Sequence, residues 1–286
     1  VPGAAHLRAG LPCQDYCGFA ACEDGTIIMA AADGHGSSAS PHSAFGARFA
    51  VNVFLRTLKE VQAEYAGDPG QLMTYLNREG SMKIAQTIEA EWKRKVVRSH
   101  LRSKRRTAPI EKGSDFRQTI QAMYGTTLLG LMIAPGFVFA YQLGDGDICH
   151  VAGGGIEMVL HPEKILGVET HSMGKPNSWK KVNTIVRGRD ETMSVPSAFI
   201  LSTDGFTNSH ASEEEYQKSC FEYFDMLVKH GPEAVAVSLP AWLAETSELG
   251  CGDDITLILV LTRKIQRAED SPIELRTNGV QDEQKR

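Results

Sequence analysis

Four aspartates of the sequence lie where an apolar run meets a turn that contains glycine. They are Asp33, Asp145, Asp204 and Asp253. The ends of strands are rigid, and glycine allows the backbone to turn tightly there. Carboxylates from distant parts of the chain can therefore converge on one point, and oxygen ligands of this kind suit hard cations such as Mg²⁺ and Mn²⁺. The pattern predicts a metal-centred active site.

The predicted cluster carries enough charge for two ions. If Asp33, Asp204 and Asp253 meet with Asp15 close by, four negative charges would roughly balance two divalent cations, and without metal some of these carboxyl groups would have raised pKa values. Two metals that share one carboxylate can activate water and hold a phosphoryl group for in-line attack. Asp33 is the predicted bridge, because the glycines that follow it allow a backbone carbonyl to join the coordination shell.

His35 follows the first of these aspartates and has three candidate roles: metal ligand, general acid or structural residue. Mg²⁺ and Mn²⁺ prefer oxygen, which disfavours a single histidine as a ligand. A serine alkoxide is a poor leaving group, and histidine can protonate it near neutral pH. We therefore predict that His35 is a general acid.

The sequence around these residues does not match an EF-hand or a phosphate-binding loop. An EF-hand at Asp145 is excluded because Cys149 occupies its fifth position and the later bidentate acid is missing. The glycines at 153–155 lack the Lys and Ser/Thr of a phosphate-binding loop. Asp24 and Gly25 have the composition of a simple hairpin turn.

Composition narrows the class of protein. The chain has 286 residues, 42% of them hydrophobic, and a formal net charge of −5. A global basic field is absent, so neither nucleic acid nor an anionic membrane is an expected partner, and no segment has the length and hydrophobicity of a transmembrane helix. The six cysteines form no CxxC pair, which favours a reducing, cytoplasmic setting.

Hydrophobic periodicity predicts an order of elements along the chain. A β-hairpin over 17–24 and 26–33 is followed by helices from about 40 to 58, capped by Ser37, Ser38 or Ser40, and from about 72 to 97, lying together on one sheet face. Two later helices are expected at 212–229 and 232–247. Strands are expected at 125–134, 137–143, 147–152, 156–160, 182–187, 197–203 and 255–262, and the last of these is predicted to be central because it is almost wholly apolar.

This order predicts an α+β fold in which two packed antiparallel sheets are flanked by helices. One domain over 1–263 accounts for it, followed by a polar, disordered tail over 264–286. The segment 162–181 has little periodicity and is predicted to be a long surface loop, a type of segment that is often functional.

A basic run extends over 93–106, with eight Lys or Arg residues. It is either a docking surface or a solvated helix end followed by a mobile loop. We favour the second interpretation, because charge runs are most often solvated.

The ordered motifs together resemble the metal-dependent protein phosphatases of type 2C, and most of all their bacterial branch. The resemblance extends over about residues 6 to 262. Its motifs are Cys13-Gln14-Asp15, Asp33-Gly34-His35-Gly36, Tyr124-Gly125-Thr126-Thr127, Gly144-Asp145-Gly146-Asp147, Ser202-Thr203-Asp204-Gly205 and Gly252-Asp253-Asp254-Ile255-Thr256.

The resemblance implies a β-sandwich flanked by helices, and roles for the acidic residues. Asp33 would bridge two Mg²⁺ or Mn²⁺ ions, and the Gly34 carbonyl would bind one of them. Asp204 and Asp253 would bind the other ion, and Asp15 would act directly or through water. Asp145 matches an aspartate linked to a third, weaker metal site, and His35 matches the family's general acid.

Two positions depart from the family pattern. Gln14 stands where many members have glutamate, and Gly10 stands where many have an arginine that holds the substrate phosphate. Arg8 or His6 could take over that contact. The loop 162–181 lies where the family has a variable flap, which suggests a part in substrate selection.

Three hypotheses follow. The leading one is hydrolysis of phosphoserine and phosphothreonine in phosphorylated proteins, without a covalent intermediate, which would reverse the action of a cognate serine/threonine kinase. The second is a pseudophosphatase that binds phosphoproteins without turnover. The third is a metal hydrolase that acts on small phosphoesters. The retained carboxylates disfavour the second, because an inactive site has no physical need for clustered acids.

Overall fold

The computed structural model describes residues 1–103, 115–162, 170–188 and 196–262. Its centre is a pair of antiparallel sheets. The five-stranded sheet has the order β1 (Tyr16–Ala21), β2 (Ile27–Ala32), β3 (Leu128–Ala134), β4 (Phe137–Leu143) and β7 (Asn183–Gly188). The four-stranded sheet has the order β6 (Gly155–Leu160), β5 (Asp147–Ala152), β8 (Ser197–Ser202) and β9 (Leu257–Thr262).

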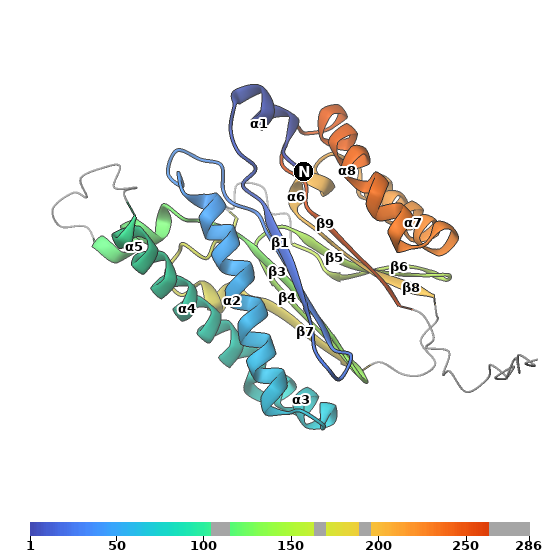
Figure 1. Cartoon of the computed structure of the whole chain (residues 1–286), viewed down its shortest axis with the longest axis horizontal. Helices are drawn as coiled ribbons and strands as arrows, with labels where there is room; N and C mark the ends of the chain where they lie inside the picture. The colour runs from blue at the N-terminus through green and yellow to red at the C-terminus, as the bar shows by residue number, and fades with distance from the viewer. Residues whose placement is uncertain (104–114, 163–169, 189–195, 263–286) are drawn as a thin grey trace, which may run out of the picture.

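An apolar core joins the two sheets. It takes buried side chains from both of them, among them Met29, Leu131, Ile148 and Leu201. Because β3 and β4 are buried along their whole length, they must be covered on their outer face as well. Figure 1 shows the resulting arrangement, in which helices lie outside each sheet. The predicted α+β sandwich is confirmed.

Two long helices cover the five-stranded sheet. They are α2 (Ser43–Glu64) and α4 (Ser81–Arg102), which pack together as predicted. The chain reaches α4 through α3 (Pro69–Tyr75) and a π-helical turn (Leu76–Gly80). The contact with the sheet is close: a Cβ at Gly130 of β3 would lie 2.0 Å from Cζ of Phe54. Only glycine fits beneath that ring.

The second helical layer consists of α7 (Glu213–His230) and α8 (Pro232–Leu249). These helices bury Tyr216, Phe224 and Leu243 against the outer face of the four-stranded sheet. The loop before α7 provides its N-cap, where the Ser212 hydroxyl accepts a hydrogen bond from the Glu215 N–H. None of the described helices is both long and apolar enough to cross a bilayer.

Two predictions about these elements are wrong. No serine side chain caps α2: its N-cap is His42, and the Ser40 hydroxyl instead donates to the Ala122 carbonyl. Strand β9 is also not central, since it forms one edge of its sheet. Its apolar sequence reflects contacts on both faces, with Ile258 turned to the core between the sheets and Leu259 to the helices.

Several short elements were not predicted. They are α1 (Ala4–Ala9), α5 (Phe116–Ala122), α6 (Asp204–Thr207) and a 3₁₀ turn (Ser178–Lys181) within the expected flap. The rest of that flap at 163–169, the end of the basic run at 104–106 and the tail at 264–286 lie outside the described residues. The domain boundary at 263 therefore stays a prediction.

Candidate metal centre

Asp33 follows β2 and is fixed by its own backbone. Its N–H donates to the Thr127 hydroxyl at 3.0 Å, and its carbonyl accepts from the Thr126 hydroxyl at 2.7 Å and the Thr127 N–H at 2.8 Å. Gly34 then forms an isolated bridge to Thr126. A Cβ on Gly34 would lie 2.8 Å from the Gln14 carbonyl oxygen, so the close approach requires glycine. The carboxylate of Asp33 is thus presented from a rigid turn.

The structure brings Asp33 together with Asp145 and Asp204. Each offers a carboxylate oxygen, and the three oxygens lie within 4.8 Å of one another. Asp145 comes from the turn after β4 and accepts a hydrogen bond from Thr170 at 2.7 Å. Asp204 opens α6 directly after β8 and accepts one from Asn208 at 3.0 Å. Oxygen atoms from three strand ends therefore share one small volume, and they are ligands suited to Mg²⁺ or Mn²⁺.

Asp15 and Asp253 flank this trio. Asp15 precedes β1 and accepts a hydrogen bond from the Thr203 hydroxyl at 2.8 Å. Asp253 lies before β9, and its side chain is about half exposed. Among the described residues, Oδ1 of Asp15 and Oδ1 of Asp145 are buried without a hydrogen-bond partner. Buried acceptors without a donor are costly, and a bound cation would satisfy both. The donor set therefore fits divalent metal.

The carboxylates of this cluster repel one another, as the sequence predicts. Burial, and then the charges of Asp15, Asp204, Asp253 and Asp145, raise the pKa of Asp33 well above its ordinary value. Burial, followed by the charges of Asp145 and Asp253, raises the pKa of Asp204 to about 7. Burial is also the main reason that the pKa of Asp15 is raised to about 6. Cations would relieve this excess of negative charge.

His35 lies half-buried in the turn that begins at Asp33. Its N–H donates to the Gly125 carbonyl at 3.2 Å, and its ring packs so closely on Gly125 that a Cβ there would lie 2.9 Å from Cδ2. Both contacts are with Gly125, so this residue holds the backbone and the ring of His35 in the turn that follows Asp33. Its catalytic role remains a prediction.

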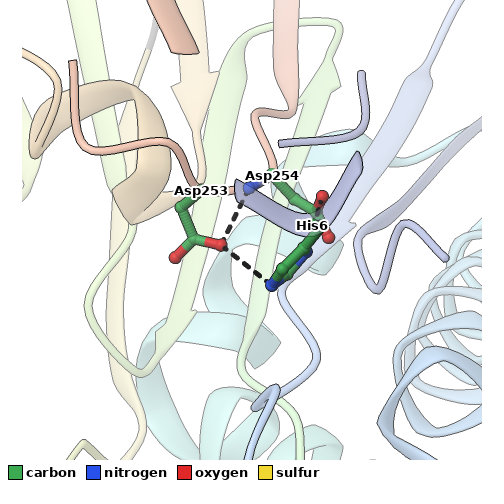
Figure 2. Close-up of side chains that lie close together, drawn as sticks. All are labelled: His6, Asp253 and Asp254. Atoms are coloured by element: carbon green, nitrogen blue, oxygen red, sulfur yellow. Dashed lines mark hydrogen bonds and ion pairs between the residues drawn. The ribbon is translucent and has the colours of Figure 1, made fainter. Parts of the chain in front are cut away.

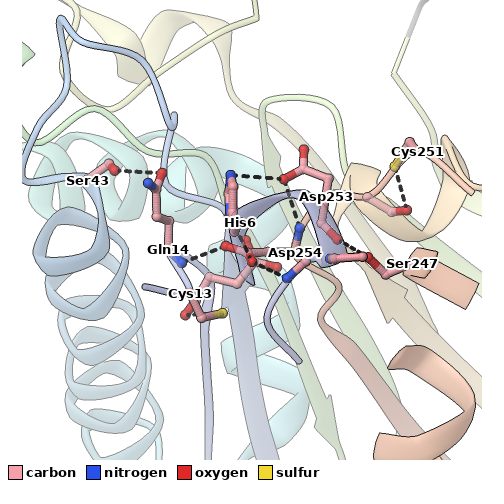
Figure 3. A network of polar contacts seen from close by, with 12 residues as sticks. His6, Cys13, Gln14, Ser43, Ser247, Cys251, Asp253 and Asp254 are labelled. Atoms are coloured by element: carbon pink, nitrogen blue, oxygen red, sulfur yellow. Dashed lines mark hydrogen bonds and ion pairs between the residues drawn. The ribbon is translucent and has the colours of Figure 1, made fainter. Parts of the chain in front are cut away.

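Asp254 is a site residue that sequence reasoning missed. It is buried, and its two oxygens accept the N–H groups of Gly3 and Gln14, each at 2.6 Å. Its Oδ1 also lies 3.0 Å from Nδ1 of His6. Figure 2 shows His6 beside Asp254, and Figure 3 also shows its contact with Gln14. The signal for such a role was an acidic residue at the head of an apolar strand, because a buried carboxylate needs several donors.

Of the two predicted phosphate contacts, His6 lies closer to the acidic loop. Its Nε2 is 3.9 Å from Oδ1 of Asp253, so the ring lies between two carboxylates. Arg8 is exposed and forms an ion pair with Glu248 of α8 at 3.2 Å. A Cβ on Gly252 would lie 3.7 Å from Nη2 of Arg8, so the guanidinium also borders the loop that carries Asp253.

A second buried carboxylate, that of Asp147, contacts α6, the helix that begins with Asp204. It is fully buried at the start of β5, and it accepts a hydrogen bond from the Thr207 hydroxyl of α6. Its other oxygen lies 2.5 Å from Nδ1 of His161, the residue after β6. Because α6 begins with Asp204, this pair of contacts fixes the helix that presents a carboxylate to the metal centre.

Comparisons with known proteins bear on the family and the fold. A sequence profile described as protein phosphatase 2C matches residues 2–245. A search by sequence among curated proteins finds no match. Among solved structures, the chain resembles a bacterial serine phosphatase with a TM-score of 0.56 and 14% identity, over 87% of this chain and 92% of the other.

Two further solved structures share the fold. Stp1 from Staphylococcus aureus has a TM-score of 0.56 and 15% identity, over 88% of this chain and 90% of the other. The catalytic domain of the serine threonine protein phosphatase PstP, in complex with two manganese ions, has a TM-score of 0.51 and 14% identity, over 87% and 90%. At these identities the likeness establishes a common fold.

Proposed function

The chain belongs to the protein phosphatase 2C family and is therefore a phosphatase, and we propose that it hydrolyses phosphoserine and phosphothreonine in proteins at a binuclear Mg²⁺ or Mn²⁺ centre. The observation that carries this proposal is the convergence of Asp33, Asp145 and Asp204 within 4.8 Å. The presence of two manganese ions in PstP supports it.

Six residues would hold the ions. Asp33 would be the shared ligand, because hydrogen bonds fix its backbone and its carboxylate lies close to those of Asp145 and Asp204. Asp204 and Asp253, with the Gly34 carbonyl, would complete the two principal sites. Asp15 would bind directly or through water, and Asp145 would contribute to the centre or to a third, weaker site. Bound cations would supply Lewis acidity, which makes water a better nucleophile and offsets the phosphoryl charge.

The chain's own groups supply the proton and the orientation. His35, held against Gly125 beside Asp33, would donate a proton to the serine or threonine oxygen as it leaves. His6 and Arg8 both border the acidic loop, and they would bind the phosphate in place of an arginine at position 10. The described end of the flap touches the centre through Thr170 and Asp145, which would couple substrate binding to the metal site.

The biological setting follows from this chemistry. The substrates would be phosphorylated proteins, and a serine/threonine kinase would be the opposing enzyme. We place the protein in the cytoplasm, since its six cysteines, all within the described residues, are free thiols.

Phosphate release from a phosphothreonine peptide tests the proposal. The purified protein is assayed in EDTA and again after addition of Mn²⁺ or Mg²⁺. Turnover that depends on the metal supports the phosphatase. Binding of Mn²⁺ and of the peptide without turnover would instead identify a pseudophosphatase, and turnover of p-nitrophenyl phosphate alone would identify a small-phosphoester hydrolase.

A further inference from the structure

The second half of α4 forms a basic groove that the metal centre does not use. Lys95, Arg98, Ser99 and Arg102 recur at helical spacing and so share one face of α4. The groove has a volume of about 370 Å³ and is lined by Phe49, Lys95, Arg98, Ser99, Arg102 and Ser103.

The cations of this groove are not neutralised by the acids nearest to them. Glu89 of the same helix pairs with Lys93, and Glu91 pairs with Arg56 and Arg94. Within the described parts of the chain, no acidic side chain forms an ion pair with Lys95, Arg98 or Arg102. Three exposed positive charges therefore remain together on a protein whose net charge is −5.

Helix stabilisation explains only part of this cluster. Arg102 lies in the last turn of α4, where a cation offsets the negative end of the helix dipole. That effect is confined to the last turn, and Lys95 lies two turns from the helix end. Its ammonium instead lies 5.3 Å from the ring centroid of Phe49, which draws it over the groove.

One buried ring, that of Tyr124, lies between the groove and the turn that carries Asp33 and His35. Phe49 stacks on Tyr124 with ring centroids 6.4 Å apart. Gly125, the next residue, is the one on which the His35 ring packs. In Figure 1 the start of α2 and the end of α4 lie at the same end of the molecule, next to α5. A polypeptide chain with its phosphate at the metal centre could thus extend to the groove.

We propose that this groove binds an acidic segment of the phosphoprotein substrate. The inference rests on the proposed function, because a phosphoprotein brings a polyanionic chain to this face. Guanidinium groups and hydroxyls suit carboxylates and phosphates, and complementary charge raises both affinity and association rate. The substrates it selects are phosphoserine or phosphothreonine sites flanked by Asp, Glu or further phosphates.

The first test measures binding without turnover. Two fluorescent phosphothreonine peptides, one with flanking Glu and one with Gln at the same positions, are titrated with protein in EDTA and followed by anisotropy. The triple variant Lys95→Gln, Arg98→Gln, Arg102→Gln should bind the Glu peptide about tenfold more weakly and the Gln peptide unchanged. Added salt should remove the difference between the peptides.

A matched control removes the same charge elsewhere. Lys83, Lys218 and Lys229 are exposed and each pairs with an acid four residues away, so their triple change to Gln should leave both peptides unaffected. Equal weakening by both triple variants, or equal affinity of the unmodified protein for both peptides, overturns the proposal. Tighter binding of a single-stranded RNA oligonucleotide than of the Glu peptide would assign the groove to nucleic acid and overturn it too.

Turnover separates this inference from the proposed function. With Mn²⁺, the groove variant should hydrolyse p-nitrophenyl phosphate at the rate of the unmodified protein and lose efficiency only on the Glu peptide. If the unmodified protein turns over no substrate but still binds the Glu peptide more tightly in EDTA, the proposed function is wrong and the proposed binding of acidic segments by the groove is supported. If it turns over both peptides equally well, the proposed function is supported and the proposed selection of acidic segments by the groove is wrong.

Discussion

At the scale of single residues, the carboxylate of Asp204 repels its acidic neighbours and is also one of the proposed metal ligands. Asp204→Asn removes one charge from the trio with Asp33 and Asp145. We expect Mn²⁺ affinity and turnover to fall together, by about 100-fold or more, while the metal-free variant melts at a higher temperature than the unmodified protein. Thermal melts with and without Mn²⁺, together with phosphate release, check both expectations.

Asp225→Asn is the matched control for this change. Asp225 lies on the surface of α7 in an ion pair with Lys229, remote in the sequence from every proposed ligand. Its variant should keep normal Mn²⁺ affinity and turnover. Normal Mn²⁺ activation in Asp204→Asn would remove Asp204 from the centre.

The role of His35 depends on the leaving group. His35→Ala should slow hydrolysis of a phosphoserine peptide by 10² or more, within the range of about 10²–10⁴ for general acid catalysis. Hydrolysis of p-nitrophenyl phosphate should change little, since its leaving group needs no proton. Comparing kcat for the two substrates, with His230→Ala as a surface control, measures the difference. Equal losses on both substrates would mean that His35 is structural.

At the scale of elements, the centre depends on how α6 is held. Thr207→Val removes the hydroxyl that donates to buried Asp147 and keeps the shape of the side chain. The free energy of unfolding should fall by about 1–3 kcal/mol, and Mn²⁺ affinity should fall about tenfold because Asp204 opens the same helix. Mn²⁺ activation curves and urea unfolding test this.

Thr207→Ser should restore both quantities, since it returns the hydroxyl. A loss of stability in Thr207→Val with unchanged Mn²⁺ affinity would show that Asp147 supports the fold without positioning the ligand.

The long elements were predictable because each repeats its pattern several times. The hairpin of β1 and β2, the paired helices and the strands from β3 to β8 all follow from local periodicity. The elements α1, α5 and α6, of six, seven and four residues, are too short for a helical period to register. The position of β9 at an edge was not predictable, because burial on two faces looks the same in sequence at an edge or at the centre.

At the scale of the whole molecule, the acidic centre makes stability depend on pH. The pKa values of Asp15 and Asp204, about 6 and about 7, lie above their ordinary value of 3.8. Between those values the folded state binds more protons than the unfolded state, so stability falls as pH rises. Metal-free protein should therefore lose on the order of 4 kcal/mol of unfolding free energy between pH 5 and pH 8.

Urea unfolding in EDTA at several pH values measures this loss. Mn²⁺ should restore the stability, and restore more of it at pH 8, where protons no longer compete for the carboxylates. Asp204→Asn should flatten the dependence. A metal-free protein that becomes more stable from pH 5 to pH 8 would contradict the proposed burial of charge.

The candidate site was predictable only in part, for a reason that also belongs to this scale. Aspartates at strand ends carry a local signal, and the structure brings Asp33, Asp145 and Asp204 together. The supporting acids Asp147 and Asp254 also stand at or just before the start of a strand, but that local signal does not identify the groups that they contact. Thr207 lies 60 positions from Asp147, and Gly3 lies 251 positions from Asp254, so only the folded topology identifies these contacts.

The contact between Gly3 and Asp254 also bears on how the protein is made. The ribosome synthesises the first of these residues long before the second, and the loop with Asp253 lies beside the later partner. Contacts of such sequence separation form late and slowly in folding. The N-terminal segment of the nascent chain therefore cannot dock until Asp254, just before β9, has been synthesised. The site that this contact helps to build can therefore form only after the residues up to Asp254 have been synthesised.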